Sequence, residues 1–417
     1  MRLLRTRKQL QVSVMVLVWV VALGFAATPS AQAQTFKTLY EFSGGADGFS
    51  PNAGVTAVVS PKGAITLYGT TYFGGNLNCN PPLGCGITFK LTLSGKETVL
   101  NRFRGGKDGA FPYAAPIVDA KGNVYGTTSA GGGASGCLGS GCGIAYEIPP
   151  KFREKALYRF TGGLDGGMPF TGLTPDKAGN FFGTTAFGGD LSCGVAPPGC
   201  GTFFEMDPTG KITVKHRFHG KPDGAFPQAG SIVDDPLWYW FAPKEGGNLA
   251  CNPPNGCGEV VRDNKSTGKL EVLHTFKGQD GELPYSGVTL NGGFVYGTTF
   301  LGGANNKGVV FKLDPNTKTF QVLHSFGLGQ DGATPGGGVA FDSQGNIYGT
   351  TESGGQAGEG TLFKIDTNGK ESVLHDFSFV DGAIPLGSLT FDPKCNCLFG
   401  TTSQSSPGEG TVWQFIL

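Results

Sequence analysis

Aromatic and charged side chains gather in one short stretch of the chain, residues 237–245. Trp238, Tyr239 and Trp240 stand together there, and Lys244 and Glu245 follow them. Flat aromatic rings stack on sugar rings, and the polar tips of Tyr and Trp can hydrogen-bond to hydroxyl groups. The stretch therefore predicts a surface that binds a glycan or a cell-envelope polymer. The alternative is that these bulky residues only fill space in a divergent part of the fold.

Three more aromatic residues stand directly before Gly-Gly pairs elsewhere in the chain. They are Tyr72, Phe73 and Phe187. If the Gly-Gly loops lie on one face of the protein, these rings extend the same aromatic platform. We therefore include them among the expected ligand-binding residues.

Catalytic groups are less clearly marked. A glycoside hydrolase needs two carboxylates at a defined separation, and Glu245, Asp190 and Glu282 are the candidates. A β-elimination lyase needs a base and a cation, for which Tyr239, His219 and Lys244 are candidates. The sequence has no Gly-x-Ser-x-Gly elbow, no phosphate-binding glycine loop and no His-Glu-x-x-His pair. We favour a non-catalytic binding protein, with a polysaccharide-cleaving enzyme on the same face as the alternative, and we expect no metal and no cofactor.

An Asp-Gly pair recurs seven times, and each time a proline stands four residues after the aspartate. The aspartates are Asp47, Asp108, Asp165, Asp223, Asp280, Asp331 and Asp381. Asp caps a turn through its own backbone and Gly accepts a positive φ, so a repeated turn explains the pair without any chemistry. His216, His274, His324 and His375 share one position with Tyr40, Asn101 and Tyr158. A position that accepts three residue types indicates packing and hydrogen bonding, whereas His219 lies outside the pattern and is expected to be solvated.

The Asp-Gly turns belong to a longer repeat. An aromatic-Gly-Thr-Thr string follows each turn, but the fourth copy reads Trp-Phe-Ala-Pro at residues 240–243. A Gly-Gly loop comes next, then strand-like runs such as residues 308–313 and 321–326. No sustained 3.6-residue apolar period interrupts these runs. Each repeat therefore predicts four short strands joined by tight turns.

Seven such repeats predict an all-β fold, a seven-bladed β-propeller of four-stranded antiparallel blades in a single domain at residues 34–417. Residues 36–42 resemble the fourth strand of a repeat, and residues 411–416 resemble the third. The N-terminal strand is therefore expected to complete the last blade and close the ring, which hides the sheet edges. In this ring the Asp-Gly turns and the Gly-Gly loops share one face, where a ligand site is expected.

The repeat also resembles a known family. The strings Tyr-Gly-Thr-Thr, Gly-Gly, Gly-Thr-x-Phe-Lys-Leu, Val-Leu-His-x-Phe and Asp-Gly-x-x-Pro follow one another in fixed order over nearly all of residues 36–417. This order is similar to the GloVer (Gloeobacter/Verrucomicrobia-type) tandem repeat. The resemblance implies an exported bacterial protein, and it implies no particular biochemical activity.

The ten cysteines form five close pairs: Cys79/Cys85, Cys137/Cys142, Cys193/Cys200, Cys251/Cys257 and Cys395/Cys397. In an exported chain such pairs indicate local disulfides, which are worth roughly 2 kcal/mol each for such small loops. We therefore expect the first four pairs to pin loops and not to create the fold. Zinc is a poorer explanation because no histidine stands beside the pairs. Cys395 and Cys397 are separated by one residue, so for them both a disulfide and two free thiols stay open.

The N-terminal segment has the features of a secretory signal peptide. Four cations precede an apolar run at residues 12–26, and the small-residue string at 31–33 predicts cleavage before Gln34. Without the leader the chain carries 28 basic residues (32 − 4) against 32 acidic ones, a net charge near −4, which disfavours nucleic acid as a partner. We therefore expect a secreted or periplasmic monomer, with residues 1–33 removed and no membrane insertion afterwards.

Overall fold

Each repeat of turn residues and short apolar runs folds into one four-stranded antiparallel sheet. The computed structural model describes residues 34–137, 139–151, 153–193, 198–221, 223–228, 233–327 and 330–417. Residues 34–417 form one compact unit, and the expected signal peptide at 1–33 lies outside the described residues. Within the described part, no helix is long and apolar enough to cross a membrane.

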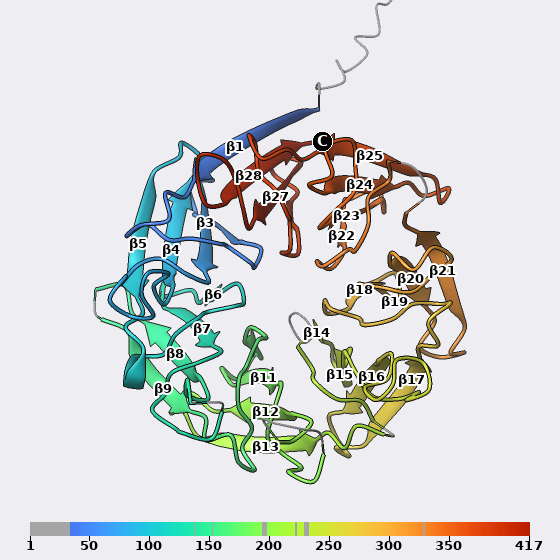
Figure 1. The fold of residues 1–417 in the computed structure, drawn as a ribbon, viewed down its shortest axis with the longest axis horizontal. Helices are drawn as coiled ribbons and strands as arrows, with labels where there is room; N and C mark the ends of the chain where they lie inside the picture. The colour runs from blue at the N-terminus through green and yellow to red at the C-terminus, as the bar shows by residue number, and fades with distance from the viewer. Residues whose placement is uncertain are drawn as a thin grey trace, which may run out of the picture. The chain divides into compact units, whose positions relative to one another are not determined.

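The seven sheets are the blades of a ring (Figure 1). Blade 1 holds β2 (Thr56–Val59), β3 (Ile65–Thr71), β4 (Ile87–Thr92) and β5 (Glu97–Arg102). Blade 2 holds β6 (Ile117–Val118), β7 (Val124–Thr128), β8 (Ile144–Ile148) and β9 (Lys155–Arg159), after a 3₁₀ turn at Gly106–Asp108. Blade 3 holds β10 (Thr174–Pro175), β11 (Phe181–Thr185), β12 (Thr202–Met206) and β13 (Ile212–Arg217). Blade 4 holds β14 (Val233–Asp234), β15 (Trp238–Phe241), β16 (Glu259–Asn264) and β17 (Leu270–Thr275).

The remaining blades follow the same plan. Blade 5 holds β18 (Thr289–Asn291), β19 (Phe294–Thr299), β20 (Val309–Leu313) and β21 (Phe320–Ser325). Blade 6 holds β22 (Ala340–Phe341), β23 (Ile347–Thr351), β24 (Thr361–Ile365) and β25 (Glu371–Asp376). Blade 7 holds β26 (Thr390–Asp392), β27 (Cys397–Thr402), β28 (Thr411–Ile416) and the N-terminal β1 (Thr35–Glu41). In Figure 1 the first strands face the centre of the ring and the fourth strands form its outer edge.

The ring closes between β1 and β28, as the sequence predicts. The two strands pair antiparallel from Thr35 opposite Ile416 to Glu41 opposite Thr411. Leu39 and Phe42 then pack with Leu67 and Phe89 of blade 1 in one buried cluster. The N-terminal strand therefore completes blade 7 and also supplies part of the interface to blade 1.

The hydrophobic core lies between adjacent blades. One cluster, for example, joins Leu273 and Phe276 of blade 4 to Val309 and Phe311 of blade 5. Third-strand aromatic rings lie over the glycine of the Gly-Thr-Thr string on the neighbouring second strand. A Cβ atom at Gly69 would lie 2.5 Å from Cζ of Phe89, so only glycine leaves room for the ring.

Blade 4 reverses this arrangement. Phe241 stands at the glycine position of β15, and its partner across the ladder is Val261, where the other blades carry an aromatic residue. The large side chain has moved from the third strand to the second, which conserves the packed volume. Part of the aromatic run in blade 4 is therefore explained by packing.

Candidate ligand-binding site

The 4→1 connections and the 2→3 loops meet on one face of the ring, as the sequence predicts. Backbone bridges join them in each blade, for example between Phe49 and Phe73 and between Ala225 and Glu245. After its proline, each connection then turns toward the centre of the ring. The residue that follows the proline lines a central cavity of 260 Å³ in all seven repeats.

These seven equivalent positions hold six different residue types although the turns before them are the same. They are Asn52, Tyr113, Phe170, Gln228, Tyr285, Gly336 and Leu386. Pocket walls in proteins are mostly apolar, with a few polar groups that fix the orientation of the ligand. Aromatic rings beside amide groups at the axis of the ring match that description.

Tyrosine and phenylalanine rings form a continuous surface on one side of the cavity. The ring of Tyr113 meets Phe170 edge-on with centroids 5.3 Å apart, and it meets Tyr72 with centroids 5.7 Å apart. Tyr72 in turn stacks on Phe111 at 5.2 Å. Tyr113 and Tyr285 line the cavity together, and burial is the main reason that the pKa of Tyr113 is raised.

A second set of equivalent positions follows the Gly-Thr-Thr string and places charged side chains beside the cavity wall. Glu352 and Lys244 occupy this position in blades 6 and 4. A Cβ atom at Gly336 would collide with Oε1 of Glu352, so the missing side chain at Gly336 makes room for this carboxyl group at the cavity wall. Burial raises the pKa of Glu352 to about 7.

Lys244 lies beside the cavity wall at Tyr285. Its Nζ lies 4.9 Å from the ring centroid of Tyr285, within the range of a cation–π contact. Burial lowers the pKa of Lys244, and the neighbouring Glu245 carboxylate partly offsets this effect. Burial likewise raises the pKa of Glu245, against the charge of Lys244. The cavity is therefore lined by aromatic and uncharged polar groups, while Glu352 and Lys244 lie beside its wall at Gly336 and Tyr285.

The structure separates the residues that the sequence analysis grouped together. Tyr72 and Lys244 lie beside the cavity wall, while Glu245 pairs through its backbone with the 4→1 connection. Phe73 packs against Phe49, and Phe187 packs edge-on against Phe226, both on the same loop face.

The blade 4 aromatics occupy other places. Tyr239 and Trp240 are 8% and 3% exposed and belong to the cores between blades. Trp238 lies at the opposite end of β15 from Lys244, where the Arg262 guanidinium sits 3.9 Å from its ring centroid. Trp238 and Arg262 line a separate hollow of 330 Å³ together with Asp235. Glu282, another residue considered for hydrolysis, pairs through its backbone with Leu301 in blade 5.

Sequence reasoning missed Tyr113, Phe170, Tyr285 and Glu352. The available signal was variation at a fixed place in the repeat, directly after the proline or after Thr-Thr. That signal was overlooked because residues of different blades meet only once the ring is closed.

All five cysteine pairs form disulfides, including the last pair, which the sequence left open. The bonds are Cys79–Cys85, Cys137–Cys142, Cys193–Cys200, Cys251–Cys257 and Cys395–Cys397. The first four brace the 2→3 loops of blades 1 to 4. In blade 1 the bonded loop begins at Gly74, whose backbone bridges that of Gly84. These four disulfides therefore fix the 2→3 loops on the face that surrounds the cavity.

The second cysteine of each of these four disulfides also belongs to a core between blades, and the pair in blade 2 illustrates this. Cys137 and Cys142 are 1% and 0% exposed, and they pack with Phe160 of blade 2 and Phe204 of blade 3. The backbone carbonyl of Cys142 also accepts a hydrogen bond of 2.8 Å from the N–H of Met168, in the next 4→1 connection. The pair therefore pins its loop, as expected, and Cys142 also helps to join two blades; the carbonyls of Cys85, Cys200 and Cys257 accept the equivalent hydrogen bonds in blades 1, 3 and 4. The loop sequence did not indicate this, because the partners of Cys142 come from the neighbouring repeat.

The family model of the Gloeobacter/Verrucomicrobia repeat matches residues 23–252 and 247–416. The chain belongs to this repeat family. No curated protein matches it in sequence. The match to the family model confirms the resemblance seen in the repeat strings of the sequence.

Solved structures resemble this Gloeobacter/Verrucomicrobia repeat protein only in fold. An oligogalacturonate lyase from Vibrio parahaemolyticus is 10% identical, with a TM-score of 0.53, over 92% of this chain and 97% of that one. A puromycin-hydrolyzing peptidase of Mycobacterium tuberculosis is also 10% identical, with a TM-score of 0.50, over 87% of this chain and 52% of that one. TolB from Acinetobacter baumannii is 16% identical, with a TM-score of 0.40; the match covers 69% of this chain and 58% of TolB. A shared fold does not decide between binding and catalysis, so both must be argued from the site.

Blade 4 also buries a carboxylate next to the loop face, and we expect it to make stability depend on pH. Glu259 is 2% exposed, and its Oε2 has no hydrogen-bond partner. Burial raises its pKa to about 7, so the folded state holds a proton that the unfolded state releases above about pH 4.5. Stability should therefore fall as the pH rises from about 4.5 to 7 and stay level above that range.

The change Glu259→Val tests this expectation, because Val309 fills the same position in blade 5. Between pH 5 and pH 8 the variant should gain on the order of 2 kcal/mol relative to the unchanged protein, as measured by urea unfolding. Parallel stability curves for the two proteins across this range would show that Glu259 is not the titrating group.

Proposed function

We propose that this protein binds a glycan or cell-envelope polymer and holds one sugar residue in its central cavity. The observation that carries the proposal is the set of seven equivalent positions after the prolines, which vary in type and converge on one cavity. Ligand pockets usually measure roughly 300–1,000 Å³, so a cavity of 260 Å³ suits a group about the size of one monosaccharide. Tyr113 and Phe170 offer ring faces, and Asn52 and Gln228 offer amide groups for hydroxyls.

The proposed location is outside the cytoplasm, in the periplasm or beyond the cell. Five disulfides close the chain's ten cysteines, and disulfides persist in oxidising compartments. The signal peptide expected at residues 1–33 supports the same location. A periplasmic or surface protein meets envelope glycans directly, which agrees with the proposed ligand class.

Calorimetric titration of residues 34–417 with neutral, uronate-containing and N-acetylated oligosaccharides tests the proposal. We expect saturable binding of one class, and the change Tyr113→Ala should weaken it about tenfold because a stacking surface is lost. The matched control is Trp238→Ala, at the opposite end of the blade, which should leave affinity unchanged. Thermal melting of both variants separates loss of binding from loss of folding.

The outcomes of this titration are distinct. Loss of affinity in Trp238→Ala, with normal affinity in Tyr113→Ala, would place the ligand in the hollow lined by Arg262 instead of the cavity. No response to any of the three classes would contradict glycan binding itself.

A second candidate function is cleavage of a polysaccharide at the same cavity. Glu352 favours it, because a carboxyl group with a pKa of about 7 beside a tyrosine can donate or accept a proton near neutral pH. New reducing ends or unsaturated products that accumulate with time, and that disappear in Glu352→Gln, would show turnover. If the protein binds the polymer and the length of the polymer stays constant, the protein binds without cleaving.

A further inference from the structure

Two histidines and an aspartate converge at the 4→1 connection between blades 3 and 4. His216 lies near the end of β13, and His219 and Asp223 follow it in the connection. Nε2 of His216 lies 2.8 Å from Oδ2 of Asp223, and Nδ1 of His219 lies 3.0 Å from the same oxygen. The three ligand atoms lie within 4.8 Å of one another.

The other repeats show which part of this cluster the turn itself requires. A fourth-strand His or Tyr bonds the turn aspartate in five other repeats, as His274 bonds Asp280 at 3.0 Å. The residue after the fourth-strand phenylalanine donates its backbone N–H to that aspartate, and in this repeat His219 does so at 2.8 Å. That residue is Ser43, Arg104, Thr161, Lys277, Gly327 or Ser378 in the other six repeats. The imidazole of His219 is therefore an addition that the turn does not need.

The ligand atoms lie within a few tenths of an ångström of the separations that a shared metal ion needs. Zinc–nitrogen and zinc–oxygen bonds of about 2.0–2.2 Å in a tetrahedral site place neighbouring ligand atoms about 3.3–3.6 Å apart. The two N···O distances in the cluster are 2.8 and 3.0 Å. Two imidazoles and one carboxylate are a donor set for zinc or a similar transition metal, whereas calcium and magnesium prefer oxygen ligands alone.

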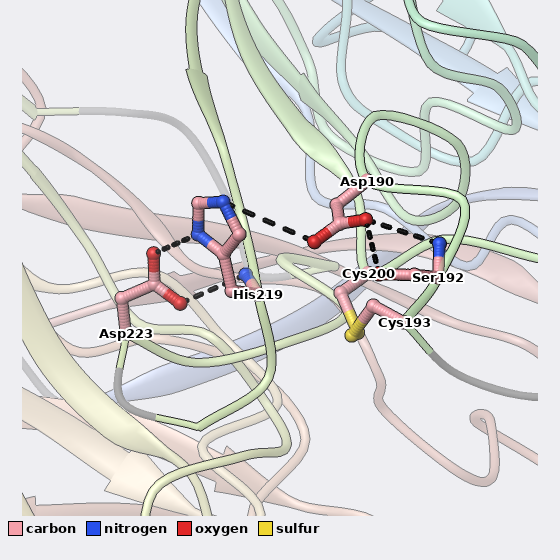
Figure 2. Close-up of a disulfide and its surroundings, with 6 residues drawn as sticks. All are labelled: Asp190, Ser192, Cys193, Cys200, His219 and Asp223. Atoms are coloured by element: carbon pink, nitrogen blue, oxygen red, sulfur yellow. Dashed lines mark hydrogen bonds and ion pairs between the residues drawn. A yellow bond between two sulfur atoms is a disulfide. The ribbon is translucent and has the colours of Figure 1, made fainter.

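A neighbouring loop is placed to orient the exposed histidine. Figure 2 shows the ring of His219 between Asp223 and Asp190, and its Nε2 lies 3.9 Å from Oδ2 of Asp190. Asp190 is held by the backbone N–H and the hydroxyl of Ser192, in the loop braced by the Cys193–Cys200 disulfide. Histidines that ligate metals usually present their other ring nitrogen to such a carboxylate.

The site is also accessible from solvent. The side chain of His219 is 53% exposed, whereas those of His216 and Asp223 are 18% and 11% exposed. An ion can therefore reach two pre-positioned ligands from solvent, and water can fill its remaining coordination positions.

We propose that His216, His219 and Asp223 bind one divalent transition-metal ion, of which zinc is the best match. The ion would lie on the loop face between blades 3 and 4, in a site that does not share residues with the lining of the central cavity. It would tie the fourth strand of blade 3 to the connection that enters blade 4.

The repeats themselves supply substitutions that keep the turn intact. Tyr40 and Tyr158 bond their turn aspartates at 3.0 Å, so His216→Tyr keeps the hydrogen bond while it removes a ligand nitrogen. Ser43 shows that serine is accepted at the position of His219, so His219→Ser keeps the backbone donor. The matched control is His274→Tyr in blade 5, whose histidine has one aspartate and no second imidazole.

The experiment uses tag-free residues 34–417 treated with a chelator and then titrated with zinc chloride against a chromogenic zinc indicator. We expect one zinc ion per chain and a rise in melting temperature on zinc addition. Both features should be kept in His274→Tyr, and zinc affinity should fall at least 100-fold in His216→Tyr and in His219→Ser. Absence of zinc binding by the unchanged protein would overturn the proposal. So would equal affinity in His219→Ser, because the hydrogen bonds alone would then explain the cluster.

Discussion

Removal of residues 34–41 should leave a chain that no longer unfolds cooperatively, because this deletion takes away β1. The edge of β28 would lose its partner from Thr411 to Ile416. Leu39 would leave the core shared with blade 1, and Phe36 would leave its stack on His375, where the ring centroids are 3.8 Å apart. Each buried apolar side chain of this size contributes about 1.5–3 kcal/mol, and a whole domain is stable by only about 5–15 kcal/mol.

The measurement is calorimetric unfolding of the shortened chain beside the chain that starts at Gln34. We expect the heat-absorption peak to vanish or to move far down in temperature, and the exposed β28 edge to promote association in size-exclusion chromatography. A synthetic peptide of residues 34–42, added in trans, should restore part of the transition. An unchanged melting temperature in the shortened chain would show that β1 does not hold the ring closed.

The architecture could be predicted from the sequence because the residues that define the turns and strands of each repeat lie within that repeat. Asp-Gly turns, the Gly-Thr-Thr string and alternating apolar residues define four strands without reference to distant contacts. Ring closure was also accessible, since residues 36–42 match a fourth strand and residues 411–416 match a third. Both predictions agree with the observed pairing of β1 with β28.

Blade 4 shows what local patterns do not contain. Phe241 replaces a strand glycine, and the compensating residue is Val261, twenty residues later and across the ladder. Unless the pairing register is known, the exchange of side-chain volume between Phe241 and Val261 cannot be recognised, and the aromatic residues of blade 4 look like an exposed cluster. The same limit applies to the cavity, because Tyr113 and Tyr285 come from blades 2 and 5 and meet only when all seven repeats are arranged around one axis.

Change of each turn aspartate to asparagine should lower stability by similar amounts in most repeats. The carboxylate of Asp331, for instance, accepts hydrogen bonds from the ring of His324 and the backbone N–H of Gly327. Asparagine offers one oxygen, and its amide group would face the second donor. Hydrogen bonds to charged groups are worth about 1.5–3 kcal/mol, so each variant should lose about 2 kcal/mol in urea unfolding. We expect this for Asp47, Asp165, Asp280, Asp331 and Asp381.

Asp108 should be the exception, because its surroundings differ. Asn101 replaces the usual His or Tyr, and Asp108 instead pairs with Arg104, whose side chain is 62% exposed. The half-buried carboxyl of Glu154 lines the same hollow as Asp108, and burial together with the Asp108 carboxylate raises the pKa of Glu154 to about 8. Asp108→Asn removes that repulsion, so its cost should be less than half that of Asp331→Asn. Equal losses of stability in Asp108→Asn and Asp331→Asn would mean that the turn alone sets the cost of the change. A variant that loses ligand binding but keeps its stability would instead assign that aspartate to the ligand-binding site.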